Sequence, residues 1–130
     1  MKKLVAIVQG GYYLAAGLWP LLSMATFEAV SGPKTDDWLV KTVGVLVTVI
    51  GFVLMWAGFL NQVNAAVGVL AIGIAAGLAA VDFLYAMQGI IWPIYMLDGV
   101  AEVVLIALWA LAISRDRAST RTAVKRPLTN

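Results

Sequence analysis

Three carboxylates lie inside apolar segments that are long enough to cross a membrane. Asp82 is in one segment, Asp98 and Glu102 are in the next, and neither segment contains a Lys, Arg or His. A charge at bilayer depth costs a few kcal/mol or more, so such residues are rare and usually functional. Asp98 and Glu102 are four residues apart, so a helix places them on one face, one turn apart. The three acids therefore predict a functional site.

Several kinds of chemistry fit carboxylates in apolar surroundings. They could do acid–base work on an apolar substrate, such as an isomerisation or a cyclisation. They could equally bind an organic cation, with aromatic rings completing the site. Oxygen ligands also suit a hard divalent ion, but the apolar surroundings disfavour one, and we expect no metal. The structural alternative is that protonated acids only form hydrogen bonds between helices, which contribute about 0.6 kcal/mol each on average.

The spacing of Asp98 and Glu102 also bears on their protonation. Like charges one turn apart repel each other, and a low dielectric strengthens the repulsion. Three arrangements would relieve it: a protonated Glu102, a cation that bridges the acids, or a water-filled cavity open to the outside. We expect at least one of the two acids to be neutral at pH 7 without ligand, with Glu102 favoured because it lies deeper.

The composition excludes several classes of function. The chain of 130 residues is 62% hydrophobic and 12% charged, whereas a soluble domain carries about 25% charged residues. It contains no Cys and no His, which excludes disulfides and nucleophilic catalysis by those residues. No phosphate-binding loop, dinucleotide fingerprint or metalloprotease motif is present, so we expect no cofactor. The net charge of +2 comes from basic residues near the chain ends, which membrane topology explains better than nucleic-acid binding.

The long apolar runs predict an all-α membrane protein, an antiparallel four-helix transmembrane bundle over residues 1–113. The first span could continue as helix to Val30, before Ser31-Gly32-Pro33 stops it, and Pro20 should kink it. Thr35 is a candidate N-cap for the second span. The basic tail of residues 114–130 should be disordered. The four predicted spans cover about residues 4–24, 36–60, 65–87 and 93–113.

Small and aromatic residues indicate how the spans pack. Glycines recur every seven residues at Gly10 and Gly17 in the first span, and at Gly44, Gly51 and Gly58 in the second, which predicts close helix packing. We expect the same role for the pair Gly73 and Gly77 in the third span. Aromatic residues toward the span ends indicate a belt at the membrane interface: Trp19, Trp38, Trp56, Trp92, Trp109, Tyr85 and Tyr95.

Helix geometry gives the depth of the candidate site. At about 1.5 Å per residue, Asp82 and Asp98 lie roughly 9 and 7–8 Å below the outer end, with Glu102 near the middle. The third and fourth spans must be neighbours, so we expect an outward-facing acidic pocket between them. Tyrosines of the first and fourth spans could complete it. The predicted ligand-binding residues are Asp82, Asp98, Glu102, Tyr85, Tyr95, Tyr12 and Tyr13.

Three strings resemble segments shared by small four-span bacterial membrane proteins of uncharacterised function. They are Gly17-Leu-Trp-Pro20, Phe27-Glu28-Ala29 followed by Gly32-Pro-Lys-Thr-Asp36, and Pro93-Ile-Tyr-Met-Leu-Asp98. This resemblance covers most of the chain and implies no function that can be transferred. The layout with membrane carboxylates is also loosely similar to the sterol-isomerase and sigma-2-type four-helix family. That similarity is an analogy only, because the motif of that family is not matched residue by residue.

The favoured hypothesis is that the pocket binds a small cationic or amphiphilic ligand with proton coupling. An extension of this hypothesis is that the protein also moves the ligand across the membrane. A bundle this small has little room for its own pathway, so transport would imply a homo-oligomer. One alternative is an accessory subunit of a larger membrane complex, with a broad apolar face covered by its partner. The other is a small acid–base enzyme on a lipid-like substrate, which is less favoured. The expected partners are the lipid bilayer and the ligand, not nucleic acid.

The distribution of basic residues predicts that both termini are cytoplasmic, in a bacterial inner membrane. With four spans, one side holds both termini and seven Lys and Arg residues, whereas the other side holds only Lys34 and Lys41. Residues 114–130 then form a basic cytoplasmic tail. Reporter fusions at Asn130 and within Ser31–Thr35 should report opposite sides of the membrane. An external C-terminus would reverse every depth assigned above.

Overall fold

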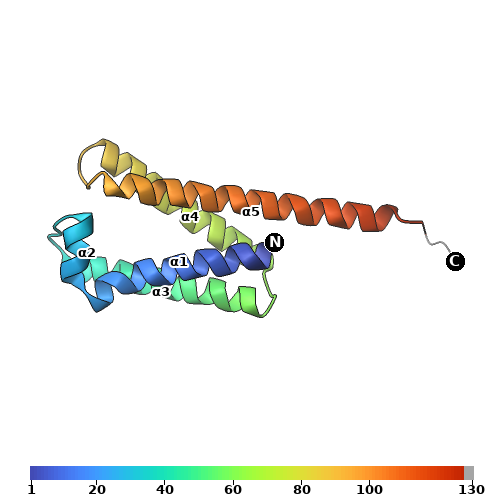
Figure 1. The fold of residues 1–130 in the computed structure, drawn as a ribbon, viewed down its shortest axis with the longest axis horizontal. Coiled ribbons are helices and arrows are strands. Elements are labelled where there is room, and N and C mark those ends of the chain that lie inside the picture. Colours follow the sequence, from blue (N-terminus) through green and yellow to red (C-terminus); the bar gives the residue numbers. More distant parts are fainter. Residues whose placement is uncertain (128–130) are drawn as a thin grey trace.

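The computed structural model describes residues 1–127, which form five α-helices (Figure 1). Four of the helices in this range are long and apolar enough to cross a membrane, so the chain is a membrane protein, as predicted. The fifth, α2, is a short helix of eight residues. The elements are α1 (Lys2–Leu22), α2 (Met24–Ser31), α3 (Asp37–Phe59), α4 (Ala65–Met87) and α5 (Ile94–Lys125).

Most helix ends lie where the sequence predicts them. Asn64 caps α4, its side-chain oxygen accepting a hydrogen bond from the Val67 N–H at 3.0 Å. Beyond α4, Gly89 has a φ of 73°, and beyond α2, Gly32 has a φ of 97°, a region that favours glycine. The N-cap of α3 is Asp36 rather than Thr35, a shift of one residue.

The first span does not continue smoothly beyond Pro20. Helix α1 ends at Leu22, and Ser23 adopts a non-helical conformation before α2 begins. Pro20 lies within the last turn of α1, and the Ser23 hydroxyl accepts a hydrogen bond from the Thr26 N–H at 3.4 Å. The chain therefore turns at Ser23, and α2 leads from the end of α1 toward the start of α5 (Figure 1).

The prediction of a disordered tail is wrong for residues 114–125, because α5 continues without a break to Lys125. Residues 128–130 of that predicted tail lie outside the described part of the chain. Two kinds of contact accompany the extension: the Lys2 ammonium lies 3.2 Å from the Asp116 carboxylate, and Ser114 and Thr120 donate hydrogen bonds to the carbonyls four residues earlier. The basic residues 115–125 are thereby carried on a helix that continues the fourth span.

The glycine seam of the first two spans is confirmed. A Cβ on Gly10 would lie 2.6 Å from the Gly51 carbonyl oxygen, and one on Gly17 would lie 2.7 Å from the Gly44 carbonyl oxygen. These pairs also show that α1 and α3 run in opposite directions. The same expectation is wrong for Gly73 and Gly77 of α4, because a Cβ at either position would meet no atom within 4 Å. Both lie on an exposed face of α4.

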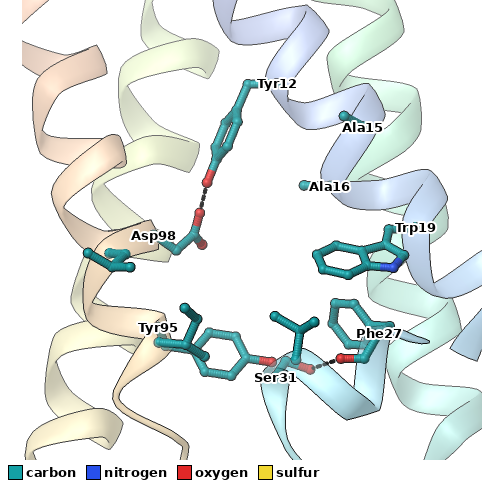
Figure 2. A pocket seen from close by; sticks show the side chains of 11 residues that line it. Tyr12, Ala15, Ala16, Trp19, Phe27, Ser31, Tyr95 and Asp98 are labelled. Atoms are coloured by element: carbon teal, nitrogen blue, oxygen red, sulfur yellow. Dashed lines mark hydrogen bonds between the residues drawn. The ribbon is translucent and has the colours of Figure 1, made fainter. Parts of the chain in front are cut away.

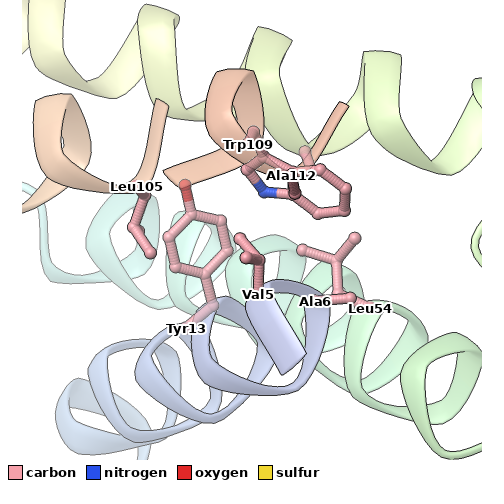
Figure 3. Close-up of a cluster of buried hydrophobic side chains, with 8 residues drawn as sticks. Val5, Ala6, Tyr13, Leu54, Leu105, Trp109 and Ala112 are labelled. Atoms are coloured by element: carbon pink, nitrogen blue, oxygen red, sulfur yellow. The ribbon is translucent and has the colours of Figure 1, made fainter. Parts of the chain in front are cut away.

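The long helices form two pairs, α1 with α3 and α4 with α5, which meet mainly through α1 and α5. In Figure 1 the two pairs diverge toward the end that carries α2. At the other end they share a core that includes Val5, Ala6 and Tyr13 of α1, Leu54 of α3, and Leu105, Trp109 and Ala112 of α5 (Figure 3). Trp109 is 0% exposed, so it belongs to this core rather than to the predicted aromatic belt.

Substitutions at the glycine seam should destabilise the protein more than matched substitutions on α4. We expect Gly17→Val to lower the midpoint of thermal unfolding by several degrees, because overpacking a tight contact costs about 1–3 kcal/mol. Gly77→Val is the matched control, since its Cβ enters open space. Trp fluorescence of both variants in the same detergent measures the midpoints. Equal losses in the two variants would contradict the packing of α1 on α3.

Candidate functional site

A pocket of about 480 Å³ lies between α1, α2 and α5, where the helix pairs diverge. Most of its lining is apolar or aromatic, and Figure 2 shows the side chains arranged around an open centre. Such a pocket suits an apolar or amphiphilic molecule of moderate size. The side chains that give it chemical character are Tyr12 and Trp19 of α1, Phe27 and Ser31 of α2, and Tyr95 and Asp98 of α5.

Helical spacing places these side chains together. Tyr12, Ala15, Ala16 and Trp19 occupy positions i, i+3, i+4 and i+7, which form one face of α1. The chain break at Ser23 then sets α2 across the open end, where Phe27 meets the Trp19 ring edge-on with ring centroids 5.6 Å apart. The pocket therefore depends on the turn after Pro20 as much as on the long spans.

Asp98 is the single acidic residue of the pocket lining. It is half-buried, and the Tyr12 hydroxyl donates a hydrogen bond to its Oδ1 (Figure 2). Aromatic rings around a carboxylate are a combination that recognises organic cations, because the ring faces and the carboxylate both attract positive charge. The arrangement can thus bind an amine or a quaternary ammonium group.

A second tyrosine–acid pair lies outside the pocket lining. The Tyr13 hydroxyl donates a hydrogen bond to Glu102 Oε2 at 2.7 Å. Tyr13 and Glu102 are each 1% exposed, and neither lines the pocket. The rings of Tyr12 and Tyr13 lie 6.0 Å apart between centroids, so the accessible pair and the buried pair are adjacent. A tyrosine of the first span therefore contacts Glu102 directly.

The other two predicted site residues lie away from the pocket. Asp82 is 5% exposed within α4, and Tyr85 lies on the surface at 39% exposed. Neither lines the pocket, whereas Tyr12, Tyr95 and Asp98 do. Within residues 1–127, Asp82 Oδ2 and Glu102 Oε1 are buried oxygens without a hydrogen-bond partner. The structure therefore brings three of the seven predicted residues into one pocket and buries Tyr13, Asp82 and Glu102.

The pocket at Asp98 does not lie between the third and fourth spans, where the sequence predicts an acidic pocket. Helices α4 and α5 pack closely near the acids: a Cβ on Gly99 would lie 2.9 Å from the Phe83 ring. The space lies instead on the other side of α5, facing α1 and α2. Sequence alone shows that adjacent spans are neighbours, but it does not show which helix gap remains open.

Two polar side chains to which the sequence pattern assigns no role in the site, Gln9 and Lys34, contact residues of the core and the pocket. The Gln9 amide donates to the Ala71 carbonyl at 3.0 Å and accepts a hydrogen bond from Trp109 Nε1 at 2.6 Å, so one side chain links α1, α4 and α5. A lone Gln within an apolar span was the available signal for such a link.

Lys34 is the second missed residue. Its ammonium donates to the carbonyls of Ser31 at 3.0 Å and Gly32 at 2.9 Å, and it lies 5.3 Å from the Tyr95 ring centroid and 5.8 Å from that of Phe27. Although Lys34 belongs to a loop and does not line the pocket, three residues that it contacts do. A positive charge therefore lies beside the α2 end of the pocket.

The donor set does not favour a metal. Within residues 1–127, no group of three or more Asp, Glu, His or Cys residues could hold a metal ion.

Comparisons with protein-family models, characterised proteins and solved structures found no match to this chain.

We expect Glu102 to be neutral at pH 7. An ionised Glu102 would be a buried charge with one hydrogen bond and one unpartnered oxygen, a costly state. Infrared spectra should contain a protonated-carboxyl band that disappears in Glu102→Gln. Asp116→Asn is the control, because that carboxylate is exposed and paired with Lys2. If the protonated-carboxyl band at pH 7 is the same in wild type and in Glu102→Gln, Glu102 is ionised and the expectation is wrong.

Proposed function

We propose that this protein is an antiparallel four-helix bundle of the bacterial inner membrane that binds a small cationic or amphiphilic ligand at Asp98. One observation carries the proposal: Asp98 is the single acid in a pocket walled by Tyr12, Trp19, Phe27 and Tyr95. A ligand cation there would interact with the carboxylate and with several aromatic rings at once, in surroundings of low dielectric.

An amphiphile fits better than a fully polar cation. Apolar lining residues such as Val30, Ile94 and Leu97 are exposed, so they form a rim that the bilayer would contact. A ligand with an alkyl chain could enter from the bilayer and leave that chain along the rim. Its charged group would then reach Asp98 without crossing the apolar core of the bundle.

Lys34 refines the expected ligand. Its ammonium lies against the Tyr95 and Phe27 rings, so it repels a second cation at the α2 end of the pocket. The amine of the ligand should therefore lie at the Asp98 end, and any group near Lys34 should be neutral or anionic. A ligand with one amine suits this charge pattern better than a diamine.

Proton coupling follows if Asp98 is protonated in the empty pocket. A bound cation favours the carboxylate over the neutral acid, so binding would then release a proton. Tyr12 holds Asp98 in position through its hydroxyl, and the adjacent Tyr13–Glu102 pair could accept or supply the proton. Moving the ligand across the membrane would need more than this one pocket, and we assign that step to a homo-oligomer.

A role as an accessory subunit is the second candidate. It is favoured by Gly73 and Gly77, which lie on an exposed face of α4 with open space at both Cβ positions. Small residues of this kind let another membrane helix approach closely. The acid–base enzyme is less favoured, because Asp98 and Glu102 do not line the same pocket.

Binding of dodecyltrimethylammonium tests the pocket directly. We expect Asp98→Asn to weaken its affinity at least tenfold, because the substitution removes the charge and keeps the size and the acceptor for Tyr12. Asp116→Asn, which removes an exposed carboxylate near the chain end, should bind like wild type. Calorimetric titration in a maltoside detergent gives the affinities.

Thermal unfolding of the same samples separates binding from stability. Asp98→Asn should unfold within a few degrees of wild type. If affinity is unchanged while the unfolding midpoint falls, Asp98 only links helices and the proposed site is wrong. Absence of binding by wild type would also reject the proposal.

A further inference from the structure

A second pocket lies at the end of the bundle opposite α2, and we infer that it binds an anionic membrane lipid. Its volume is about 310 Å³, and it lies between the first turn of α1, the first two turns of α4 and the later part of α5. It shares no lining residue with the pocket at Asp98. The two sites are therefore independent, and this inference does not rest on the proposed function.

The charges of the second pocket favour an anion. Its two ionisable lining residues, Lys2 and Arg117, are both basic. Asp116 lies beside them and pairs with Lys2 at 3.2 Å, but an ammonium has three donors, so Lys2 keeps donors for a ligand. Arg117 can hold two oxygens of a phosphate with its planar guanidinium. A phosphate group thus matches both the sign and the donor geometry of the rim.

The depth of the pocket matches a lipid that stands in the bilayer. Arg117 is 23 residues beyond Ile94, or about 35 Å along α5, which exceeds the roughly 30 Å of the hydrocarbon core. Trp109 is 15 residues beyond Ile94, or about 23 Å, which remains inside the core. The basic rim therefore lies at headgroup level, and the rest of the pocket lies at acyl-chain level.

The apolar part of the lining explains why the ligand is a lipid and not free phosphate. Below Lys2 and Arg117 the pocket is lined by Val69 and Ile72 of α4 and by Trp109 and Ile113 of α5. An acyl chain would cover Val69, Ile72 and Ile113, which are exposed or partly exposed, whereas a soluble anion would leave them bare. Gly68 also lines the pocket, and a Cβ there would meet no atom within 4 Å, so this position leaves room for the chain.

The experiment compares lipid binding in nanodiscs of phosphatidylcholine with and without 20 mol% phosphatidylglycerol, followed by native mass spectrometry. Wild type should retain phosphatidylglycerol at least tenfold more strongly than phosphatidylcholine. The double variant Lys2→Gln, Arg117→Gln should lose this preference. The matched control, Arg121→Gln with Lys125→Gln, removes the same charge farther along α5 and should keep it. The lipid composition is the same in both leaflets, so the result does not depend on topology.

A second pair of variants tests the apolar part of the pocket. Gly68→Leu should lower phosphatidylglycerol retention several-fold by filling the space, whereas Gly73→Leu, which is open but outside the pocket, should not. Unfolding midpoints in phosphatidylcholine alone check that each variant is folded. If Gly68→Leu does not fold, the comparison of wild type with the Lys2→Gln, Arg117→Gln variant tests the inference by itself.

Three outcomes would overturn the inference. One is equal retention of the two lipids by wild type. Another is that the Arg121→Gln, Lys125→Gln control loses the preference for phosphatidylglycerol as fully as the Lys2→Gln, Arg117→Gln variant does. That result would mean unspecific attraction to the basic helix. The third is displacement of the lipid by millimolar inorganic phosphate, which would identify a soluble anion as the ligand.

Discussion

Three polar side chains on one face of α1 hold the two helix pairs together. Gln9, Tyr12 and Tyr13 are spaced by three and four residues, and each bonds to α5, at Trp109, Asp98 and Glu102. Within a bilayer, lipid chains are as apolar as the helix surfaces, so apolar burial gives little drive for the pairs to meet. Pairing of α1 with α3 comes from the glycine seam, and joining that pair to α4 and α5 depends on these bonds.

The position of the pocket follows from this arrangement. The Gln9 and Tyr13 links lie where the core is closed, and the Tyr12 link to Asp98 lies at the edge of the open space. Beyond Asp98 no further polar link between α1 and α5 occurs within the described residues, so the helices separate and α2 closes their end. The bond between Tyr12 and Asp98 is therefore both the last polar link of the bundle and part of the pocket wall, and it uses only one oxygen of the carboxylate, Oδ1.

The sequence predicts where the helices begin and end better than it predicts which helices pack together. Apolar runs and turn residues place α4 at residues 65–87, as observed, and the seven-residue spacing identifies the seam of Gly10 and Gly17. Periodicity defines a face of a helix but not the neighbour that it meets. For this reason the sequence predicts close packing at Gly73 and Gly77 where a Cβ meets no atom, and it groups Asp82 with Asp98, although Asp82 does not line the pocket at Asp98. Trp109 shows the same limit, because its position near a span end does not reveal that it faces Gln9.

The two acids of α5 are one turn apart, yet their surroundings differ. Glu102 is enclosed, with one oxygen bonded to Tyr13 and the other unpartnered, so a ligand could reach it only by opening the contact between α1 and α5. Asp98 is half-buried at the wall of an aromatic space and holds a single tyrosine bond. A cation bound as proposed would meet Asp98 first, and its charge would act on Glu102 across the adjacent tyrosine rings and the short distance along the helix. In the proposed function, binding at Asp98 would thereby be coupled to the proton of Glu102 without any contact between the ligand and Glu102.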